Sequence, residues 1–521
     1  MTRNHNQLPP ISDLSRHNAE RSGEDVAFED PSRAVTWEEF ERRSCRAANA
    51  FRTYASRGDR IAYYCEASVD HTVLFNGGMK AGCTVTNLHT NTSPRNLRYC
   101  LTEIRPTVVV VDEGLVGEFF ECANEESLQS VAVIVSIGED PDPETVGMDQ
   151  FLAGADATNP DVLVEEDDLL VIGWTSGSTG RPKGWCHTNR TMYLKGMELG
   201  SRPGFDRTGT MLLVNKPSFL VWFSLYTKAV LGGEATYYLP DWDPERWLEL
   251  VESKGITQST LVPTMWRAVL DEDHHSYDLS SLRSIVSTGE KLSPSTLRAL
   301  REHICENVSQ TYGSTEIHST VLYNEELTEA RIESVGKPQA GTELRIIEPG
   351  GEPDERKPRG ETGEIIVKSP DAPAWVWGDT AKTHDQFRDG WWYSRDLGYR
   401  DEDGFLYIEG RADFMIKSKG VKIVPAPIEA ALNDHPDVEN AIVVGTPDEE
   451  YGQMVTAVVR AKDADLSEDE LDRWCLDHDS VANHERPRAY YFVDDIERTP
   501  SGKLDRIRTV EELGMSIGSS E

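Results

Sequence analysis

The chain has 521 residues, and its 90 acidic residues against 53 basic ones give a formal net charge of −37. A surface this acidic repels phosphate backbones and anionic lipids, which excludes nucleic acid and anionic membranes as favoured partners. The length exceeds what one hydrophobic core usually serves, so two or three domains are expected, and a hydrophobic content of 38% suffices for globular folding.

The acidic residues are spread along the whole chain and are not gathered in a tail. Self-repulsion of this size opposes a compact state unless salt screens it. The surface would suit the salt-rich interior of a halophile, and the alternative is an acidic enzyme of an ordinary mesophile.

We therefore expect the melting temperature to rise between low and multimolar KCl, because added salt screens the repulsion between the acidic groups. Thermal melting at a series of KCl concentrations measures this. A melting temperature that stays flat or falls over that range contradicts the halophilic interpretation.

The first residues, MTRNHNQ, contain no apolar stretch, and no run of 18 apolar residues occurs in the chain. A signal peptide and a membrane-spanning helix are thus not expected, and the sequence predicts a soluble, cytoplasmic protein. The eight cysteines form no C-x-x-C pair and have no histidine at metal-ligand spacing, which predicts reduced, mostly buried thiols.

Short apolar runs bounded by Gly, Pro and Asp recur through the first four hundred residues, with helical patterns between several of them. The predicted strands include Val108 to Val111, Val131 to Val135, Leu169 to Ile172, Met211 to Val214 and Leu344 to Ile347. The clearest predicted helices are Trp37 to Arg52 and Pro244 to Ser253. This alternation favours layered α/β architecture with largely parallel sheets.

After Arg411 the pattern changes to that of a small α+β domain of about 110 residues. The sequence predicts helices at Ala426 to Asn433 and Glu468 to Asp477, and strands at Asn440 to Val444 and Val455 to Arg460. We accordingly predict a large domain over residues 1–411 and a small one over residues 412–521.

One segment has the composition of a phosphate-binding loop. It follows the apolar run at 169–172 and consists of Thr175, Ser176, Gly177, Ser178, Thr179, Gly180, Arg181, Pro182, Lys183 and Gly184. Glycines let backbone N–H groups face an anion, hydroxyls add donors and the lysine adds charge. Pro182 before the lysine and Gly184 after it disfavour a Walker-type loop, and Thr175 stands where a hydrolase elbow needs serine. The alternative is a Ser/Gly-rich surface turn.

Four further segments follow in order, and together with this loop they resemble the landmarks of the adenylate-forming superfamily, which includes acyl- and aryl-CoA synthetases, peptide-synthetase adenylation domains and luciferases. The segments are Thr311-Tyr312-Gly313-Ser314-Thr315-Glu316, Ser394-Arg395-Asp396-Leu397-Gly398-Tyr399, Gly410-Arg411-Ala412-Asp413 and Arg498-Thr499-Pro500-Ser501-Gly502-Lys503-Leu504-Asp505-Arg506. The resemblance implies a large N-terminal domain that binds ATP and acid, and a small C-terminal domain that rotates between two catalytic poses.

The resemblance also implies roles for individual residues. Lys183 and the loop hydroxyls would hold the β- and γ-phosphates, Glu316 would bind Mg²⁺, and Thr315 would lie near the α-phosphate. Lys503 would neutralise the carboxylate and the α-phosphate in the transition state. The remaining nucleotide contacts implied are Gly289, Glu290, Lys291, Gln310, Thr311, Tyr312 and Gly313 around the adenine, and Asp396 and Arg411 at the ribose. Asp413 corresponds to the hinge.

Departures from the family pattern concern the acid and the thiol. Segment 215–223 has no histidine where many fatty acyl relatives have Pro-x-x-His, and its aromatic residues Phe219, Trp222 and Phe223, with Gly313, are expected to form the acid pocket. Phe414 stands where relatives often have a second Asp. Lys419, Gly420 and Lys422 are candidates for binding coenzyme A, although both lysines could equally form ordinary structural ion pairs.

The resemblance therefore predicts an AMP-forming acyl-CoA synthetase that uses ATP, Mg²⁺ and coenzyme A on a carboxylic acid larger than acetate, of medium-chain, branched or aryl type. One alternative is a freestanding adenylation enzyme that loads an aryl or amino acid onto a carrier protein. The α-amino-binding Asp of amino-acid activators has no counterpart near Phe219. The other is a non-catalytic nucleotide-binding protein.

Overall fold

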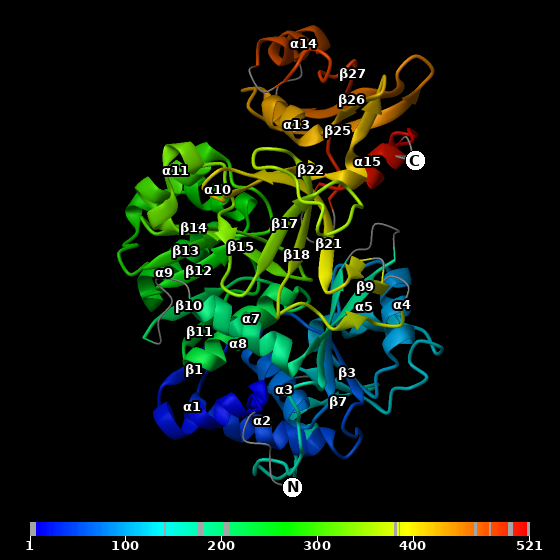
Figure 1. Ribbon diagram of the computed structural model, residues 1–521. Coiled ribbons are helices and arrows are strands. Elements are labelled where there is room, and N and C mark those ends of the chain that lie inside the picture. The colour runs from blue at the N-terminus through cyan, green and yellow to red at the C-terminus, as the bar shows by residue number, and fades with distance from the viewer. Residues whose placement is uncertain are drawn as a thin grey trace. The chain divides into compact units, whose positions relative to one another are not determined.

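The computed structural model describes residues 7–139, 142–175, 181–201, 208–379, 383–384, 386–462, 466–478, 481–498 and 504–517. The chain divides into two compact units (Figure 1). Unit 1 comprises Met1–Glu343 and Lys368–Gly390, and unit 2 comprises Leu344–Val367 and Trp391–Glu521. The boundary predicted between residues 411 and 412 stays a prediction.

The first sheet of unit 1 has eight strands among the described residues, in the order β19-β9-β8-β4-β3-β5-β6-β7. Its strands from β8 to β7 run parallel, and β9 and β19 extend one edge in antiparallel fashion. The strands are β3 (Arg60–Tyr64), β4 (Thr84–Asn87), β5 (Val108–Asp112), β6 (Val133–Ile137), β7 (Val146–Gly147), β8 (Leu169–Thr175), β9 (Lys183–Thr188) and β19 (Trp375–Val376).

The second sheet of unit 1 has nine strands in the described part, in the order β16-β15-β14-β13-β12-β10-β11-β1-β2. The six strands from β14 to β1 are parallel, and the remaining three are antiparallel at the edges. The strands are β1 (Val26–Glu29), β2 (Ala34–Thr36), β10 (Thr210–Leu213), β11 (Ala235–Tyr238), β12 (Gln258–Leu261), β13 (Ser284–Ser287), β14 (Val308–Gly313), β15 (His318–Leu322) and β16 (Lys337–Pro338).

The helices of unit 1 begin with recognisable caps. Ser68, Ser93, Asp243 and Ser293 each accept a hydrogen bond from a backbone N–H of the first turn, and proline opens three of these four helices. The helices are α1 (Leu14–Ser22), α2 (Trp37–Phe51), α3 (Val69–Lys80), α4 (Pro94–Ile104), α5 (Val116–Cys122), α6 (Met148–Leu152), α7 (Asn189–Gly200), α8 (Leu220–Gly232), α9 (Pro244–Lys254), α10 (Pro263–Asp271) and α11 (Pro294–His303).

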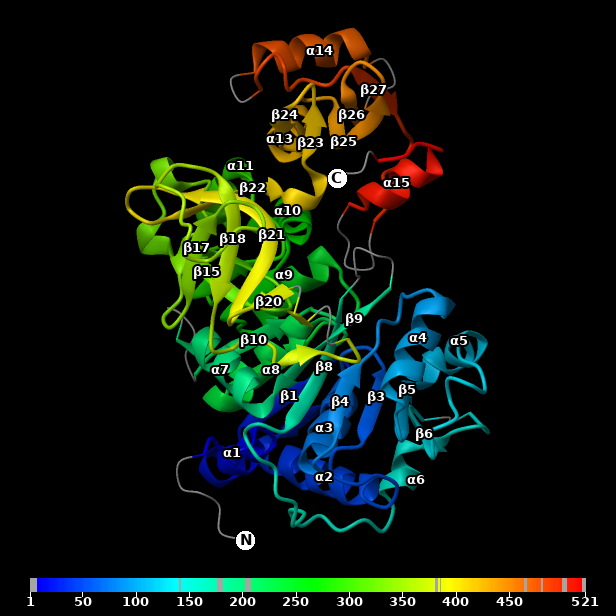
Figure 2. The ribbon, with the colours of Figure 1, turned by 45° about the vertical axis from the view of Figure 1, so that its right-hand side comes forward.

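The core of unit 1 lies on both faces of the first sheet, because successive side chains of a strand point to opposite faces. Ile61 and Tyr63 join a cluster with residues of α2, α3 and α8, whereas Ala62 and Tyr64 join a second cluster with α4 and α5. Figure 2 shows α2 and α3 on one side of this sheet and α4 and α5 on the other. Burial on both faces explains why the strands read as continuous apolar runs in the sequence.

Unit 2 contains two sheets. In the first, β18 lies between β17 and β21, and β22 pairs with β21. In the second, the strand order is β24-β23-β26-β25, and β27 pairs with β26. The elements are β17 (Glu343–Ile347), β18 (Gly363–Lys368), β21 (Trp391–Arg400), β22 (Leu406–Arg411), β23 (Ile416–Ser418), β24 (Val421–Ile423), α13 (Pro425–Asn433), β25 (Val438–Asp448), β26 (Gly452–Ala461), α14 (Glu468–Asp477), β27 (Ala489–Phe492) and α15 (Arg506–Glu512).

The secondary structure confirms most segments predicted from the sequence, but the strand predicted at Val131 to Val135 is displaced and is observed as β6 (Val133–Ile137). The helix predicted over Glu468 to Asp477 is α14, and the apolar runs at Val108 and Leu169 are β5 and β8. All eight cysteines are buried and unlinked in the described part of the chain, as expected. No helix of that part is long and apolar enough to span a bilayer.

Candidate active site

The predicted nucleotide-binding residues of unit 1 follow the carboxyl ends of parallel strands. Thr175 ends β8, Gly289 follows β13, and Tyr312 is near the end of β14. In open α/β sheets, ligands bind outside these strand ends, where loops are free to vary. The topology therefore places the predicted residues at the edge of each sheet where a ligand is expected.

The phosphate loop connects β8 to β9. These strands are antiparallel, with Thr175 opposite Lys183. The indole Nε1 of Trp185 donates to Oγ1 of Thr175 over 3.1 Å, which fixes that hydroxyl at the base of the loop. Ser176, Gly177, Ser178, Thr179 and Gly180 lie outside the described residues.

Three segments far apart in the sequence meet at Gly173 in β8. A Cβ atom at this position would lie 3.2 Å from Cδ1 of Leu220 and 3.6 Å from Cγ2 of Thr315. Leu220 begins α8, in the segment predicted to bind the acid, and Thr315 belongs to the segment predicted to bind adenine and magnesium. Glycine at 173 thus permits the close approach of the three segments in unit 1.

Gln310 holds the loop that carries Gly289, Glu290 and Lys291. Its side chain is 1% exposed, its Oε1 accepts from the backbone N–H of Leu292 over 2.8 Å, and its Nε2 donates to the carbonyl of Ser334 over 2.9 Å. A buried amide whose two ends bond to backbone supports the loop. Its contact with adenine stays a prediction.

Three other residues predicted to surround the adenine, Gly289, Lys291 and Thr311, differ in their surroundings. Gly289 has a φ of 89°, in the left-handed region that favours glycine. Lys291 lies 3.3 Å from Glu333 in an exposed ion pair, and the hydroxyl of Thr311 donates to that of Thr288 over 3.0 Å. The Thr311 bond joins the ends of β13 and β14 beside the predicted adenine slot.

A tight turn presents Thr315 and Glu316. Oγ of Ser314 accepts from the backbone N–H of Glu316 over 3.2 Å, and the N–H of Ser314 donates to the carbonyl of Ile317 over 2.8 Å. Thr315 and Glu316 are both half-buried. Their hydroxyl and carboxylate are hard oxygen donors, which is the ligand chemistry that Mg²⁺ prefers, so the residues present fit this ion.

The aromatic residues predicted to line the acid pocket differ in burial. Trp222 is 0% exposed and Phe223 is 1% exposed, and both pack against Phe75 and Tyr226 in the core cluster. Phe219 is only half-buried. It precedes α8 and is therefore the aromatic residue of this segment with surface available to a ligand.

His89 is a residue that the motif analysis missed. It follows β4, its ring centroid lies 4.9 Å from that of Phe219, and its Nε2 lies 3.4 Å from the carbonyl of Trp174. Burial lowers the pKa of His89, which favours a neutral imidazole at neutral pH. Segment 215–223 contains no histidine, but His89, which follows a different strand, lies beside Phe219 of this segment. Strand β4 reads TVTN, with a single apolar residue, so no local pattern in the sequence marks His89 as part of the site.

A charged pair adjoins the same strand ends. Nζ of Lys216 lies 2.8 Å from Oε1 of Glu66, which also accepts from the hydroxyl of Thr90 over 2.8 Å. Glu66 follows β3, and Lys216 follows β10. Unit 1 therefore gathers His89, Phe219 and an ion pair near the segment expected to bind the acid.

In unit 2, a network of charged groups surrounds the residues predicted to bind ribose. Asp396 and Arg411 are cross-strand partners on β21 and β22, and Nη1 of Arg411 lies 3.0 Å from Oδ1 of Asp396. Asp413 pairs with Arg411 over 2.9 Å and with Arg395 over 3.1 Å. The predicted ribose ligands and the predicted hinge residue are thus electrostatically linked.

The described residues on either side of the segment with Lys503 pair with each other. Arg498 and Leu504 form a β-bridge, and the N–H of Asp505 donates to the carbonyl of Glu497 over 2.7 Å. Residues 499–503, including Lys503 itself, lie outside the described part. Nε of Arg506 lies 3.1 Å from Oε1 of Glu429, which anchors the start of α15 to α13.

The sequence matches two family models. Residues 15–373 match the model described as "AMP-binding enzyme", and residues 427–503 match "AMP-binding enzyme C-terminal domain". The chain belongs to the AMP-binding enzyme family. The predicted superfamily is confirmed, and so is the predicted fold of a large α/β N-terminal part followed by a small C-terminal one.

The curated relatives of this AMP-binding enzyme include acid–thiol ligases. A 3-hydroxybenzoate–CoA ligase from Aromatoleum sp. (strain CIB) is 28% identical over 92% of each chain, and a feruloyl-CoA synthase from Amycolatopsis sp. is 30% identical over 90% of this chain and 92% of its own. The crystal structure of ATP-bound MatB from Rhodopseudomonas palustris superposes with a TM-score of 0.86 at 25% identity, covering 96% of this chain and 98% of that one. The enzyme is an acid–thiol ligase.

Of the residues predicted to bind coenzyme A, Lys419 and Gly420 form a tight turn between β23 and β24 of the enzyme, and Lys422 belongs to β24. Lys419 and Gly420 have φ angles of 49° and 82°. Nζ of Lys419 lies 2.6 Å from Oε1 of Glu450 and 4.0 Å from the ring centroid of Tyr451. The hydrogen bond with Glu450 raises the pKa of Lys419. An ion pair within unit 2 therefore engages this lysine, and the side chain of Lys422 lies outside the described residues.

Proposed function

We propose that the enzyme is an AMP-forming acyl-CoA ligase that activates a carboxylic acid larger than acetate, of medium-chain, branched or aryl type. The observation that carries the proposal is the meeting of β8, the start of α8 and the Thr315 turn at Gly173. These segments carry the residues expected to bind phosphate, acid and magnesium.

Adenylate formation needs positioning and charge neutralisation more than proton transfer. In the first half-reaction, the acid carboxylate attacks the α-phosphorus of ATP, and diphosphate leaves. Thr175 and Lys183 at the base of the loop, with the loop hydroxyls, would hold the departing phosphates. Glu316 would hold Mg²⁺, which when bound neutralises charge on the phosphate oxygens, and Thr315 would lie near the α-phosphate.

Asp396 is suited to accept from both ribose hydroxyls, since a carboxylate has two acceptor oxygens. Arg411 would donate to the same sugar while its other nitrogen keeps Asp413 in place, as the 2.9 Å pair allows. In the second half-reaction, the thiol of coenzyme A attacks the acyl carbonyl carbon and AMP leaves. Lys419 could reach a phosphate of coenzyme A only by giving up its pair with Glu450.

The acid would lie beside Phe219 and His89. A neutral His89 adds no charge that would compete for the carboxylate, and Phe219 offers apolar surface to the rest of the acid. The resemblance implies a tryptophan at the position of Gly313 in acetyl-CoA synthetases, so glycine at the end of β14 would leave room for a larger acid. Trp222 and Phe223, which are buried in the core, would pack behind the acid pocket and would not contact the acid.

The test is diphosphate release on a panel of acids from acetate to octanoate and benzoates, with and without coenzyme A. We expect turnover with several larger acids, a much weaker response to acetate, and strong stimulation by coenzyme A. Diphosphate release that coenzyme A leaves unchanged but a phosphopantetheinyl carrier protein stimulates would favour the carrier-loading alternative. Failure with every acid would contradict the proposal.

A proline at position 413 should separate the two half-reactions. Asp413 lies in a short 3₁₀ turn, Ala412–Phe414, directly after β22. Proline restricts the backbone there and opposes a hinge rotation. For Asp413→Pro we expect thioester formation from a supplied acyl-adenylate to fall roughly 100-fold, while adenylate formation is retained.

Asp413→Ala is the matched control, because it also removes the ion pairs to Arg395 and Arg411 but leaves the backbone free to rotate. Its loss of thioester formation should be much smaller. The same loss in both variants would assign the effect to the ion pairs and remove the hinge interpretation.

A further inference from the structure

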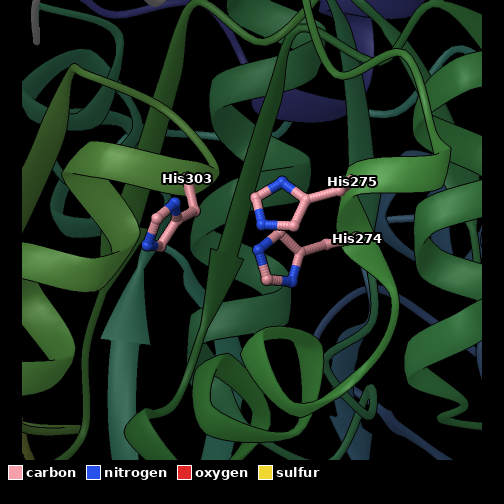
Figure 3. A group of neighbouring side chains, drawn as sticks. All are labelled: His274, His275 and His303. Atoms are coloured by element: carbon pink, nitrogen blue, oxygen red, sulfur yellow. The ribbon is translucent and has the colours of Figure 1, made fainter.

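Three histidines gather on unit 1 outside the candidate active site. His274 and His275 open the 3₁₀ turn η3 (His274–Ser276), shortly after α10, and His303 is the last residue of α11. One ring nitrogen from each lies within 4.8 Å of the other two. Figure 3 shows the rings of His274 and His275 lying side by side on one segment, with His303 on the neighbouring one.

The position of the proton on His274 follows from its hydrogen bond. Nδ1 lies 2.9 Å from the carbonyl oxygen of Glu272, and because a carbonyl can only accept, Nδ1 carries the hydrogen. In the neutral ring, the lone pair is therefore on Nε2. A metal-binding histidine typically has this arrangement, with one nitrogen donating to a carbonyl and the other facing the ion.

Nε2 of His274 needs a partner. The residue is 8% exposed, and Nε2 is buried without a hydrogen-bond partner among the described residues. A buried acceptor that bonds to nothing destabilises the fold, so such atoms usually have a role. The two other histidines are exposed, and their ring centroids lie 4.2 and 5.6 Å from that of His274.

The ring spacings suit a shared ion. The centroid of His274 lies 4.2 Å from that of His275 and 5.6 Å from that of His303, and the latter two are 5.4 Å apart. Bonds of about 2.0–2.1 Å to a tetrahedral zinc ion place ligand nitrogens roughly 3.3 Å apart. The ligand nitrogens lie within 4.8 Å of one another, so binding would draw the two exposed side chains closer to His274.

We propose that His274, His275 and His303 bind one Zn²⁺ ion, with water completing the coordination. Three neutral imidazoles are borderline-soft ligands that suit zinc, whereas Mg²⁺ and Ca²⁺ require oxygen ligands. The site would be separate from the magnesium site expected at Glu316, both in ligand type and in position.

The topology gives the site a structural role. The turn η3 precedes β13 and α11 precedes β14, so the histidines lie on the amino-terminal side of these parallel strands. The nucleotide-binding residues follow the carboxyl ends of the same strands. The ion would therefore join the segment after α10 to the end of α11 and stabilise the fold without touching the reacting atoms.

A second cluster, His435, Asp437 and Glu470, is a weaker candidate for the same ion. Nδ1 of His435 already accepts from the backbone N–H of Asp437 over 3.2 Å. Two of its three potential ligands are carboxylates, which bind zinc in competition with water. The all-imidazole cluster is thus the site that a titration should detect first.

The experiment is calorimetric titration of ZnCl₂ into the full-length, tag-free, chelator-treated enzyme in high KCl, which screens weak binding to surface carboxylates. We expect one tight site. The double variant His275→Ala/His303→Ala should bind Zn²⁺ roughly tenfold or more weakly at that site. The matched control is His17→Ala/His484→Ala, which removes two exposed histidines elsewhere and should bind as the wild type does.

Thermal melting gives a second readout. At a free Zn²⁺ concentration 100 times the dissociation constant, binding raises the ratio of folded to unfolded protein about 100-fold. The melting temperature of the wild type and the control should therefore rise, and that of the double variant should not. Equal zinc affinity in the wild type and the double variant would overturn the proposal, as would no binding by the wild type at micromolar Zn²⁺. Ligase activity should be the same in all three proteins, so this test is independent of the proposed function.

Discussion

Lys503→Ala should nearly abolish acyl-adenylate formation while sparing the attack of coenzyme A on a supplied acyl-adenylate. The lysine charge is expected to act only while the carboxylate attacks the α-phosphorus, when two negative groups approach each other. Removing one preorganised charge at such a site typically lowers the rate about 10²–10³-fold. Acid-dependent diphosphate release measures the first step, and thioester formation from synthetic acyl-adenylate measures the second.

Lys503→Arg is the matched variant, because arginine keeps the charge but spreads it over a planar group of different shape. It should recover part of the lost adenylation rate. An equal loss of both half-reactions in Lys503→Ala would count against a lysine that serves one step only. A rate unchanged by the substitution would remove Lys503 from the mechanism.

Gly313→Trp should shift the preference of the enzyme toward shorter acids. An indole at the end of β14 would occupy the space proposed for the distal part of the acid. Each methylene that is no longer buried costs about 0.8 kcal/mol, so losing room for a few carbons should change relative kcat/KM values by roughly one to two orders of magnitude. Initial rates on acids from acetate through octanoate and benzoate measure the shift.

Gly313→Ala serves as the control, since a methyl group fills little of the space and should leave the order of substrates unchanged. The interpretation of an open pocket is wrong if the wild type prefers acetate to every longer acid. It is also wrong if Gly313→Trp does not shift the preference toward shorter acids. A loss of activity on all acids alike would indicate that glycine at 313 serves the backbone beside the nucleotide.

Much of the secondary structure could be predicted because burial and periodicity leave a direct trace in the sequence. Strand β5 reads as an uninterrupted run of valines because both of its faces are covered by helices. Helix α9 begins at the Asp243-Pro244 signal. The pairing of β1 with β11 could not be predicted, because Phe28 and Thr236 are brought opposite each other only by the assembled sheet.

The candidate site was predictable where it is built from local motifs and not where it depends on packing. The segments at Thr175 and Glu316 could be found in the sequence because their composition marks them locally, and the structure places Thr175 at the end of β8 and Glu316 in a turn after β14. Helix α8 is apolar almost all round, so its sequence does not distinguish Trp222 in the core from Phe219 beside a strand end. His89 precedes Phe219 by 130 residues in the sequence, so no local pattern could indicate the contact between their rings.

Unit 2 is formed by two separate stretches of the chain, which matters for the design of chimeras between this protein and its relatives. Strand β18 precedes the excursion of the chain into Lys368–Gly390, and its partner β21 follows that excursion. In a chimera joined at residue 390, β18 and its neighbour β21 would come from two different proteins. If these strands do not pair well, β18 becomes an exposed edge strand that is prone to aggregation. A crossover just after Arg411 inherits β18, β21 and β22 from one parent, together with the Asp396–Arg411 pair that spans the last two.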